Sequence, residues 1–453
     1  MIWQVNQKAL LGLILFTTSA LAVNCTAVSV KSESDAETLR QNCPIITGNL
    51  TIGPFPQNVS SVHIKLDGIE FINGSINHEA GDGGNTFTVS SSTLLKVGGS
   101  VIFGGDDDKA CNVNNFTAPN LSIVSGSFWI GTRCSDLTYL DITSLEYVDY
   151  IHLEGRSLTT LRHTKLSNTT GLWIGDTLID SVDSLFNNPL NITGEAILGT
   201  LPNVRYVTVG FQSAYSLEVF SNTTVILGGS STTEMSLESL RLSGLTGLER
   251  SPKLESLTAE VVTIMPTGNI SQIYLPFDDL RMLSVSEAAY SNVVTLRLPA
   301  KAVNWTGGFM LDVVLSPGLN LSSMYGVDEQ GNNIQTWYWP TNVSYIRISE
   351  TIVANPFFDT FVAQQNGLTN GTTTPSVLGG FSITPSNRSH FNCTPFYNLW
   401  RIHRLTKSVG SYGSEEEYDC LSRGVSESAG HYYQVPSLIS IIGVVFGILA
   451  WGI

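Results

Sequence analysis

The sequence predicts an all-β-rich solenoid, a right-handed parallel β-helix or leucine-rich-repeat-like coil, with disulfide-clipped caps and few short helices. The first observation is a motif, apolar-x-Gly-x-apolar-x-apolar-Gly, at 46–53 and again at 97–105, 124–131 and 192–199. The second is that the copies and their looser variants recur with a period in the low twenties, which is typical of solenoids. The third is that cysteines bracket the repeats. Because one rung cannot bury its own apolar side, stacked rungs form a continuous core.

Each rung is expected to contribute a short strand with two inward apolar residues, because alternation over four or five residues indicates a half-buried strand. Glycine after the strand permits a tight corner. From Val101 onward the first four intervals between pairs are 27, 23, 21 and 24 residues. The expected pairs are Leu50/Ile52, Val101/Phe103, Phe128/Ile130, Ile151/Leu153, Leu172/Ile174 and Ala196/Leu198, followed by the weaker Val225/Leu227, Leu240/Leu242, Val262/Ile264, Leu283/Val285, Leu296/Leu298 and Ile346/Ile348.

The segments at the two ends of the repeats are expected to cover the open rungs. A helix is predicted near 34–41, inside the first cap, and another over 397–405, where the last cap is expected to break the repeat. The stretch 364–380 is expected to be a loose loop.

The cysteines indicate disulfides, since their number is even and the chain carries a secretory leader. Six cysteines allow fifteen pairings, and only proximity in the sequence favours one set. That set is Cys25–Cys43, Cys111–Cys134 and Cys393–Cys420. Zinc is not expected, because no CxxC occurs and histidine is scarce.

Residues 1–22 are interpreted as a secretory signal peptide. Lys8 supplies the basic start, 9–17 form a short apolar core, and 20–22 read Ala-Leu-Ala, a small-x-small cleavage site. The apolar run is too short to span a membrane.

The last residues are interpreted as a signal for a glycosylphosphatidylinositol (GPI) anchor. The stretch 438–453 is apolar or small throughout and no basic residue follows it. Small residues at 428–430 and a polar spacer precede it, which is typical of GPI attachment. We expect attachment at Ser428, with Ser426 and Gly424 as competing sites; an ordinary transmembrane helix is the alternative.

The composition indicates a glycosylated surface. Charged residues make up only 13% of the chain, about half the usual share. The net charge of −15 argues against nucleic acid or anionic lipid as a partner. N-x-Ser/Thr sequons occur along the whole chain. They begin at Asn24, Asn49, Asn58, Asn73, Asn115, Asn120, Asn168, Asn191, Asn222, Asn269, Asn304, Asn320, Asn342, Asn370, Asn387 and Asn392.

The Cys-rich cap, Gly-punctuated strands and repeat period resemble the receptor L-domain of growth-factor receptor ectodomains. With the signal peptide, the sequons, the "CTPFYNLW…YDC" element at 393–420 and the GPI tail, the chain is similar to the fungal GPI-anchored wall-organisation family, the sporulation-specific and extracellular-mutant proteins. The resemblance implies a non-enzymatic role in wall assembly and integrity. It also implies wall polysaccharide or wall and membrane proteins as partners, at the outer plasma membrane or in the wall. Relatives often carry a long Ser/Ala-rich stalk, whereas only 421–427 separate Cys420 from Ser428 here, which favours retention near the membrane.

The expected division is a signal peptide (1–22), an N-terminal disulfide cap (23–45), two L-domain-like lobes (46–190 and 191–363), a loop (364–392), a C-terminal disulfide cap (393–420), a short linker (421–428) and a propeptide that is removed (429–453).

Catalysis, cofactors and metals are not expected. A secreted parallel β-helix that degrades polysaccharide is one alternative, and it would need two carboxylates around the scissile bond. The candidates are Asp106–Asp108 and Asp278–Asp279, which are interpreted as a solvated turn and a loop. No G-x-S-x-G elbow occurs. A receptor-like ligand-binding ectodomain is the second alternative.

One column of side chains is a candidate binding face. If the apolar pairs face inward, the residues between them face outward, which places Trp129, His152 and Trp173 in successive rungs with Tyr150 beside them. Ile102 and Ile197 occupy the equivalent positions on either side. Exposed rings can bind the faces of sugars or a protein partner. The competing interpretation is that other parts of the molecule cover this column.

Overall fold

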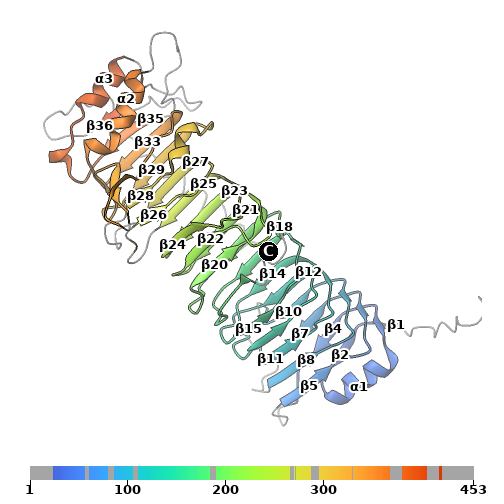
Figure 1. Ribbon diagram of the computed structural model, residues 1–453. Helices are drawn as coiled ribbons and strands as arrows, with labels where there is room; N and C mark the ends of the chain where they lie inside the picture. The colour runs from blue at the N-terminus through green and yellow to red at the C-terminus, as the bar shows by residue number, and fades with distance from the viewer. Residues whose placement is uncertain are drawn as a thin grey trace, which may run out of the picture.

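The computed structural model is an elongated parallel β-solenoid of about 10 turns with few short helices, which confirms the predicted fold class. It runs from helix α1 (Glu33–Asn42) at one end to α2 (Asp359–Gly367) and α3 (Thr394–Arg401) at the other (Figure 1). The structure describes residues 24–56, 61–79, 86–105, 111–183, 190–265, 270, 272–286, 295–328, 330–367, 380–402, 404–405 and 418–420.

One face of the coil is a 22-stranded sheet, called the main sheet below, whose strands pair in parallel from rung to rung. A strand that lies beside its equivalent in the next rung leaves no backbone group unpaired except at the two ends. The main sheet comprises β1 (Asn24–Cys25), β2 (Val28–Val30), β3 (Ile45–Ile46), β4 (Leu50–Ile52), β6 (Phe71–Ile72), β7 (Ile76–His78), β9 (Lys96–Val97), β10 (Val101–Phe103), β12 (Ile123–Ile130), β14 (Tyr147–Leu153), β16 (Asn168–Thr169), β17 (Gly171–Ile174), β18 (Leu190–Ile192), β19 (Glu195–Leu198), β21 (Phe211–Phe220), β23 (Glu234–Ser243), β25 (Ser256–Met265), β27 (Asp279–Ser286), β29 (Phe309–Val314), β33 (Val343–Ser349), β35 (Gly380–Thr384) and β36 (Tyr418–Cys420).

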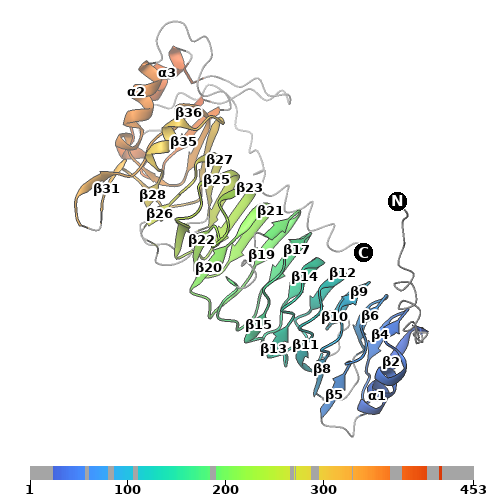
Figure 2. The same ribbon diagram turned by 45° about the vertical axis from the view of Figure 1, so that its right-hand side comes forward.

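Shorter parallel sheets form the second face (Figure 1). They are β5 (Ser61–Lys65), β8 (Thr86–Ser90), β11 (Val113–Thr117), β13 (Tyr139–Asp141) and β15 (Thr160–Arg162), then β20 (Tyr206–Val209), β22 (Thr224–Leu227) and β24 (Gly247–Arg250), then β26 (Gln272–Tyr274) with β28 (Thr295–Arg297), and β30 (Asn320–Leu321) with β34 (Ile352–Val353). An antiparallel hairpin, β31 (Tyr325–Val327) with β32 (Asn333–Gln335), projects from the coil near the last rungs (Figure 2).

The inward pairs of the main sheet are mostly those that the sequence predicts. Phe128 and Ile130, for example, lie in register with Ile151 and Leu153 of the next rung, and all four are fully buried. Two predicted pairs, Val225/Leu227 and Leu296/Leu298, are buried as expected but belong to the second face. In these places the main sheet carries two pairs that were not predicted, Leu217/Val219 and Leu311/Val313. The reason is that both faces of a rung carry the same alternation, so periodicity does not distinguish them.

The glycines that open the motif are required by the close approach of neighbouring rungs. A Cβ on Gly48 would lie 2.7 Å from the backbone nitrogen of Ala27, and one on Gly74 would lie 2.6 Å from the carbonyl carbon of Gly48. On Gly98 it would lie 2.3 Å from the carbonyl oxygen of Asn73. At these points backbone packs directly on backbone, and only glycine leaves room.

Polar side chains bind the backbone of the next rung beside these glycines. The side-chain oxygen of Asn49 accepts a hydrogen bond from the N–H of Ser75, at 2.9 Å. Ser75 Oγ accepts from the N–H of Ser100, and Ser100 Oγ from the N–H of Ser127, both at 3.0 Å. The side chains therefore satisfy backbone groups where the strand is interrupted.

The first cap is as predicted. Helix α1 extends the predicted 34–41 by one residue at each end. Ser32 caps it, since its hydroxyl accepts from the N–H of Asp35 at 3.1 Å. Ala36 and Leu39 are buried against the first rungs, so the helix covers their apolar end.

The last cap differs from the prediction in three ways. Residues 364–367 of the predicted loop belong to α2, and the loop predicted over 364–392 also contains β35. The helix predicted over 397–405 is α3, and it begins at Thr394 rather than at 397. It follows Cys393 directly and has Pro395 in its first turn. The segment that closes the cap does not break the ladder either, because β36 pairs in parallel with β35.

Aromatic packing fills this last cap. Phe358 contacts Trp339, Phe361 and Phe396 at ring-centroid distances of 5.5, 6.2 and 5.0 Å. Trp339 and Phe358 are fully or almost fully buried, so the helices cover the last rung with a large apolar contact.

The three disulfides pair as predicted. Cys25–Cys43 joins β1 to the end of α1, Cys393–Cys420 joins the start of α3 to β36, and Cys111–Cys134 joins two neighbouring rungs. Each closes a loop of 18 to 27 residues, which is worth about 3 kcal/mol in the loop-entropy model.

Several predicted features lie outside the described residues. They are the signal peptide, the GPI region with Ser428, Ser426 and Gly424, the carboxylates Asp106–Asp108, and the sequons Asn58, Asn269 and Asn370. Among the helices that the structure describes, none is long and apolar enough to cross a membrane. The main sheet continues through the expected lobe boundary, since β18 spans 190–192 and pairs with β16 and β21.

Candidate functional site

The predicted aromatic column exists, and its members stack on one another. Parallel register places Trp129 beside His152, and His152 beside Trp173. The rings of Trp129 and His152 are 3.7 Å apart between centroids with an interplanar angle of 5°, and those of His152 and Trp173 are 5.4 Å apart at 25°. The ring faces therefore stack along the solenoid axis, because neighbouring strands lie about 4.8 Å apart and bring the rings close together.

This stacking changes what the column can bind. His152 is only 6% exposed and Ile197 9%, while Trp129 and Trp173 are half-buried. Both faces of the His152 ring are covered by tryptophan, so the expectation of free ring faces is wrong for the centre of the stack. The residues that cover the rings thus belong to the column itself, and Ile102 and Ile197 continue it beyond Trp129 and Trp173. What reaches solvent is the edges of the indoles.

Glycines make room for the stack. The position of a Cβ on Gly131 lies 3.2 Å from Nε1 of Trp129, and that on Gly175 lies 3.3 Å from Nε1 of Trp173. The "Trp-Ile-Gly" triplet, which occurs twice in the sequence, thus has a physical reason: the indole lies over the glycine two residues later.

Two polar groups border the stack. Tyr150 lies over Gly171, where a Cβ would approach its ring to 2.4 Å. Burial, followed by the negative charges of Glu195 and Glu154, raises the pKa of Tyr150. Glu154 Oε2 lies 2.9 Å from Nε2 of His152, a contact that is not aligned as a hydrogen bond and becomes an ion pair when the imidazole is protonated.

The candidate carboxylates Asp278 and Asp279 differ in their surroundings. Asp278 forms ion pairs with Arg250, at 2.7 Å, and with Lys301, and it accepts the N–H of Leu257 at 2.7 Å. Burial works to raise the pKa of Asp278, but the Lys301 and Leu257 hydrogen bonds and the two cations outweigh it and lower the pKa. Asp278 therefore connects three rungs as an ionised group.

Asp279 is the first residue of β27 and faces away from the core. Its Oδ2 accepts a long hydrogen bond from Thr306, at 3.4 Å. Its Oδ1 is buried and has no hydrogen-bond partner. A buried carboxylate oxygen without a donor is costly, by about 1–3 kcal/mol or more.

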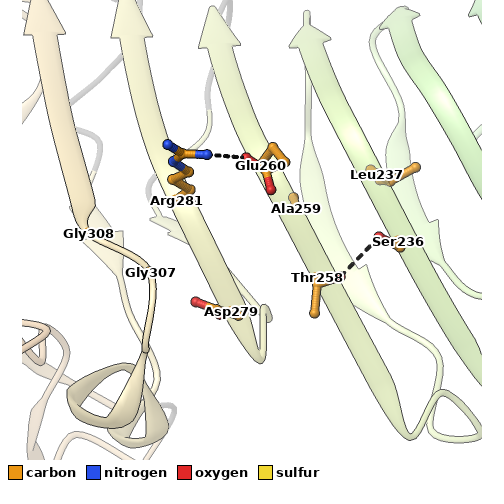
Figure 3. Close-up of a pocket in the computed structure, with 9 residues that line it drawn as sticks. All are labelled: Ser236, Leu237, Thr258, Ala259, Glu260, Asp279, Arg281, Gly307 and Gly308. Carbon is orange, nitrogen blue, oxygen red and sulfur yellow. Dashed lines mark hydrogen bonds and ion pairs between the residues drawn. The ribbon is translucent and has the colours of Figure 1, made fainter. Parts of the chain in front are cut away.

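Asp279 borders a polar hollow that the sequence does not indicate (Figure 3). The register between β27 and β29 begins only at Met282 and Met310, so the first residues of β27 have no strand beside them on that side. A loop with Gly307 and Gly308 takes the place of the missing strand. The opening has a volume of about 480 Å³ and is also lined by Ser236, Leu237, Thr258, Ala259, Glu260 and Arg281.

Histidine–serine pairs occur but do not resemble a catalytic triad. His63 Nε2 lies 3.0 Å from Ser90 Oγ on the exposed second face, and His390 Nδ1 lies 2.9 Å from the neighbouring Ser389. A nucleophile and its base need a third group that orients the base. Within the described ranges no carboxylate is hydrogen-bonded to either ring.

Among the residues that the structure describes, no three His, Cys, Asp or Glu side chains come together in a group that could hold a metal ion. Comparisons of the chain with models of protein families, with curated proteins and with solved structures gave no match.

Proposed function

We propose that the chain is a non-enzymatic, GPI-anchored cell-surface glycoprotein that supports the organisation and integrity of a fungal cell wall. The observation that carries the proposal is the 22-stranded main sheet, which presents one long outward face. A long regular face suits contact with an extended polymer or with several copies of a partner, as in other solenoids. The secretory leader, the sequons and the GPI-type tail supply the location in this proposal.

The positions of the sequons support a glycosylated surface. Every sequon asparagine whose burial the structure describes is exposed or half-buried. These residues are Asn49, Asn73, Asn115, Asn120, Asn168, Asn191, Asn222, Asn304, Asn320, Asn342, Asn387 and Asn392. None of these sequon asparagines lies on β23, β25 or β27 or in the aromatic column.

The lack of catalysis in this proposal is supported by the state of Asp278. Its two cationic partners and its lowered pKa make it unsuited to act as a general acid, which must hold a proton near neutral pH. Purified protein incubated with wall glucans and with pectin should release no reducing sugar. Release that disappears in Asp278→Asn or Asp279→Asn would replace the proposal with the polysaccharide-degrading alternative.

The cellular role is tested by deleting the gene and growing the cells on dyes that stress the wall. We expect hypersensitivity that the wild-type gene restores. The double variant Ser426→Leu/Ser428→Leu should not restore it and should leave the surface, because branched side chains do not fit a small-residue attachment site. Normal growth of the deletion strain, or recovery of a peptide from 438–453 in the mature surface protein, would contradict the proposal.

A further inference from the structure

We propose that the polar hollow between β25, β27 and the Gly307–Gly308 loop binds one unit of a neutral saccharide, with Asp279 as its principal acceptor. Asp279 lines the hollow, and its carboxylate is poorly satisfied within the protein. Oδ1 is closed to solvent and has no donor, and Oδ2 accepts only the 3.4 Å hydrogen bond from Thr306. The position of a Cβ on Gly307 lies 4.0 Å from Oδ1, so there is space beside the carboxylate. A ligand hydroxyl in that space would supply a donor after a small rotation of the carboxylate.

The remaining lining also suits hydroxyl groups. Thr258 Oγ1 donates to Ser236 Oγ at 3.2 Å, which leaves the Ser236 proton free to donate and both oxygens able to accept. Glu260 and Arg281 form an exposed pair at 3.0 Å, so Arg281 retains further N–H donors (Figure 3). A sugar carries several hydroxyls, each a donor and an acceptor, on a ring that the small residues Ala259, Gly307 and Gly308 can admit.

Charge narrows the class of saccharide. Glu260 is balanced by Arg281, whereas Asp279 has no cation bonded to it among the described residues, so the hollow carries a negative charge. An acidic sugar would place like charges together, which is unfavourable. A neutral sugar meets no such penalty. A hard cation is the competing occupant, but it prefers six or more oxygen ligands and the hollow offers fewer fixed ones.

This inference rests on the proposed function only for the source of the saccharide. The site belongs to the main sheet but lies three rungs or more from Trp173, so it is independent of the aromatic stack. Loss of binding in vitro and loss of the cellular phenotype can therefore be observed separately.

The test is titration calorimetry on the full glycosylated protein. The probes are a β-1,3-linked glucose hexasaccharide, an N-acetylglucosamine hexasaccharide, an oligogalacturonate and calcium ion alone. Asp279→Asn removes the charge and replaces one of the two acceptor oxygens by an amide donor, and Gly307→Leu fills the space. Glu238→Gln is the control for the carboxylate, since Glu238 is exposed on β23 and does not line the hollow. Gly367→Leu is the control for the glycine, because a Cβ there meets nothing within 4 Å.

At least one neutral hexasaccharide should bind the wild type, and the oligogalacturonate should bind at least ~10-fold more weakly. Asp279→Asn and Gly307→Leu should each weaken binding by ~10-fold or more, while both controls bind as the wild type does. Three results would overturn the inference: no neutral hexasaccharide binds, affinity is unchanged in both variants, or calcium alone binds and is lost in Asp279→Asn. If the inference fails while deletion of the gene still weakens the wall, the proposed function stands without this site.

Discussion

The outward column of the main sheet changes its chemistry halfway along the solenoid. From Ile102 to Ile197 it is a stack of rings flanked by isoleucines. From Glu218 onward the same register runs through charged and small polar residues to Asp312 and Arg347. Arg347 binds Asp312 with two hydrogen bonds of 2.6 Å. Outward side chains of neighbouring rungs lie about 4.8 Å apart in both halves. They contact each other by ring stacking in one half and by an ion pair in the other.

The two halves also differ in regularity. In the aromatic half successive rungs are 21 to 27 residues long, whereas 35 residues separate the paired side chains Asp312 and Arg347. The extra residues of this rung include the β31–β32 hairpin, visible beside the coil (Figure 2). The rung before it, from Ser284 to Asp312, contains the 3₁₀ turn at Ala300–Asn304. Where β29 starts late, the hollow opens. The aromatic column is thus filled by contacts among its own side chains, while the irregular half leaves an open space beside the main sheet.

The largest effect is expected from breaking the ion pair. Asp312→Ala leaves the half-buried Arg347 without its carboxylate and should lower the free energy of unfolding by roughly 3–5 kcal/mol. Urea unfolding followed by circular dichroism measures it. The double variant Asp312→Leu/Arg347→Met should recover much of the loss, because no unpaired charge remains. Equal losses in the single and double variants would show that the pair itself is not what holds these rungs.

Acid should first weaken the N-terminal rungs that precede the aromatic column. His78 stacks on Phe87 at 5.0 Å inside the coil, and burial lowers its pKa to about 4 from the ordinary 6.5. The unfolded chain therefore binds the proton more readily, so this stability is complete above pH 6.5 and falls as pH drops toward 4. The loss should reach up to about 3 kcal/mol. His78→Leu should remove most of this pH dependence in urea unfolding at pH 7.5 and 4.5.

The irregular half provides the contrast. The lowered pKa of Asp278 means that its contribution is present above its ordinary pKa of 3.8 and is lost only below that value. Hydrogen exchange at pH 4.5, corrected for the intrinsic rates, should thus rise around β7 and β8 and remain low in β25 and β27. A uniform rise along the solenoid would contradict the distinction.

Removing a ring from the stack should have a moderate effect. Trp129→Ala exposes one face of His152 and should cost about 2 kcal/mol, less than for a fully buried tryptophan because the indole edge already meets solvent. Trp129→Phe should cost less, since a ring remains. Thermal unfolding measures both losses. A melting temperature unchanged in Trp129→Ala would indicate that the stack does not contribute to the stability of the fold.

The smallest effect concerns Gly171. An added methyl group would meet the Tyr150 ring at 2.4 Å, so Gly171→Ala should displace the ring and cost about 1 kcal/mol. In a Tyr150→Ala background the same change should cost much less. Additive losses in this double-mutant cycle would mean that the ring does not lie over the glycine.

The sequence predicts the solenoid because its information is local. Each pair such as Leu172/Ile174 indicates a half-buried strand, and the repeat distance indicates that successive rungs stack. It fails at Val225/Leu227, since two faces of one rung look alike. The sequence places Trp129 and Trp173 in one column. Whether the faces or the edges of these rings reach solvent depends on the side chains of the rungs on both sides. The hollow has no local signal at all, because it arises from a strand that starts late beside Asp279.

We expect the aromatic stack to contribute to stability and not to ligand binding, and Asp279 in the irregular half to contribute to ligand binding and not to stability. The most direct test measures thermal unfolding and affinity for the neutral hexasaccharides on Trp173→Ala and Asp279→Asn in parallel. We predict that Trp173→Ala lowers the melting temperature and binds as the wild type does. Asp279→Asn should keep or raise the melting temperature, because a carboxylate with one buried, unpaired oxygen is removed, and should bind ~10-fold more weakly or worse. The reverse outcome, with binding lost in Trp173→Ala and kept in Asp279→Asn, would contradict the account.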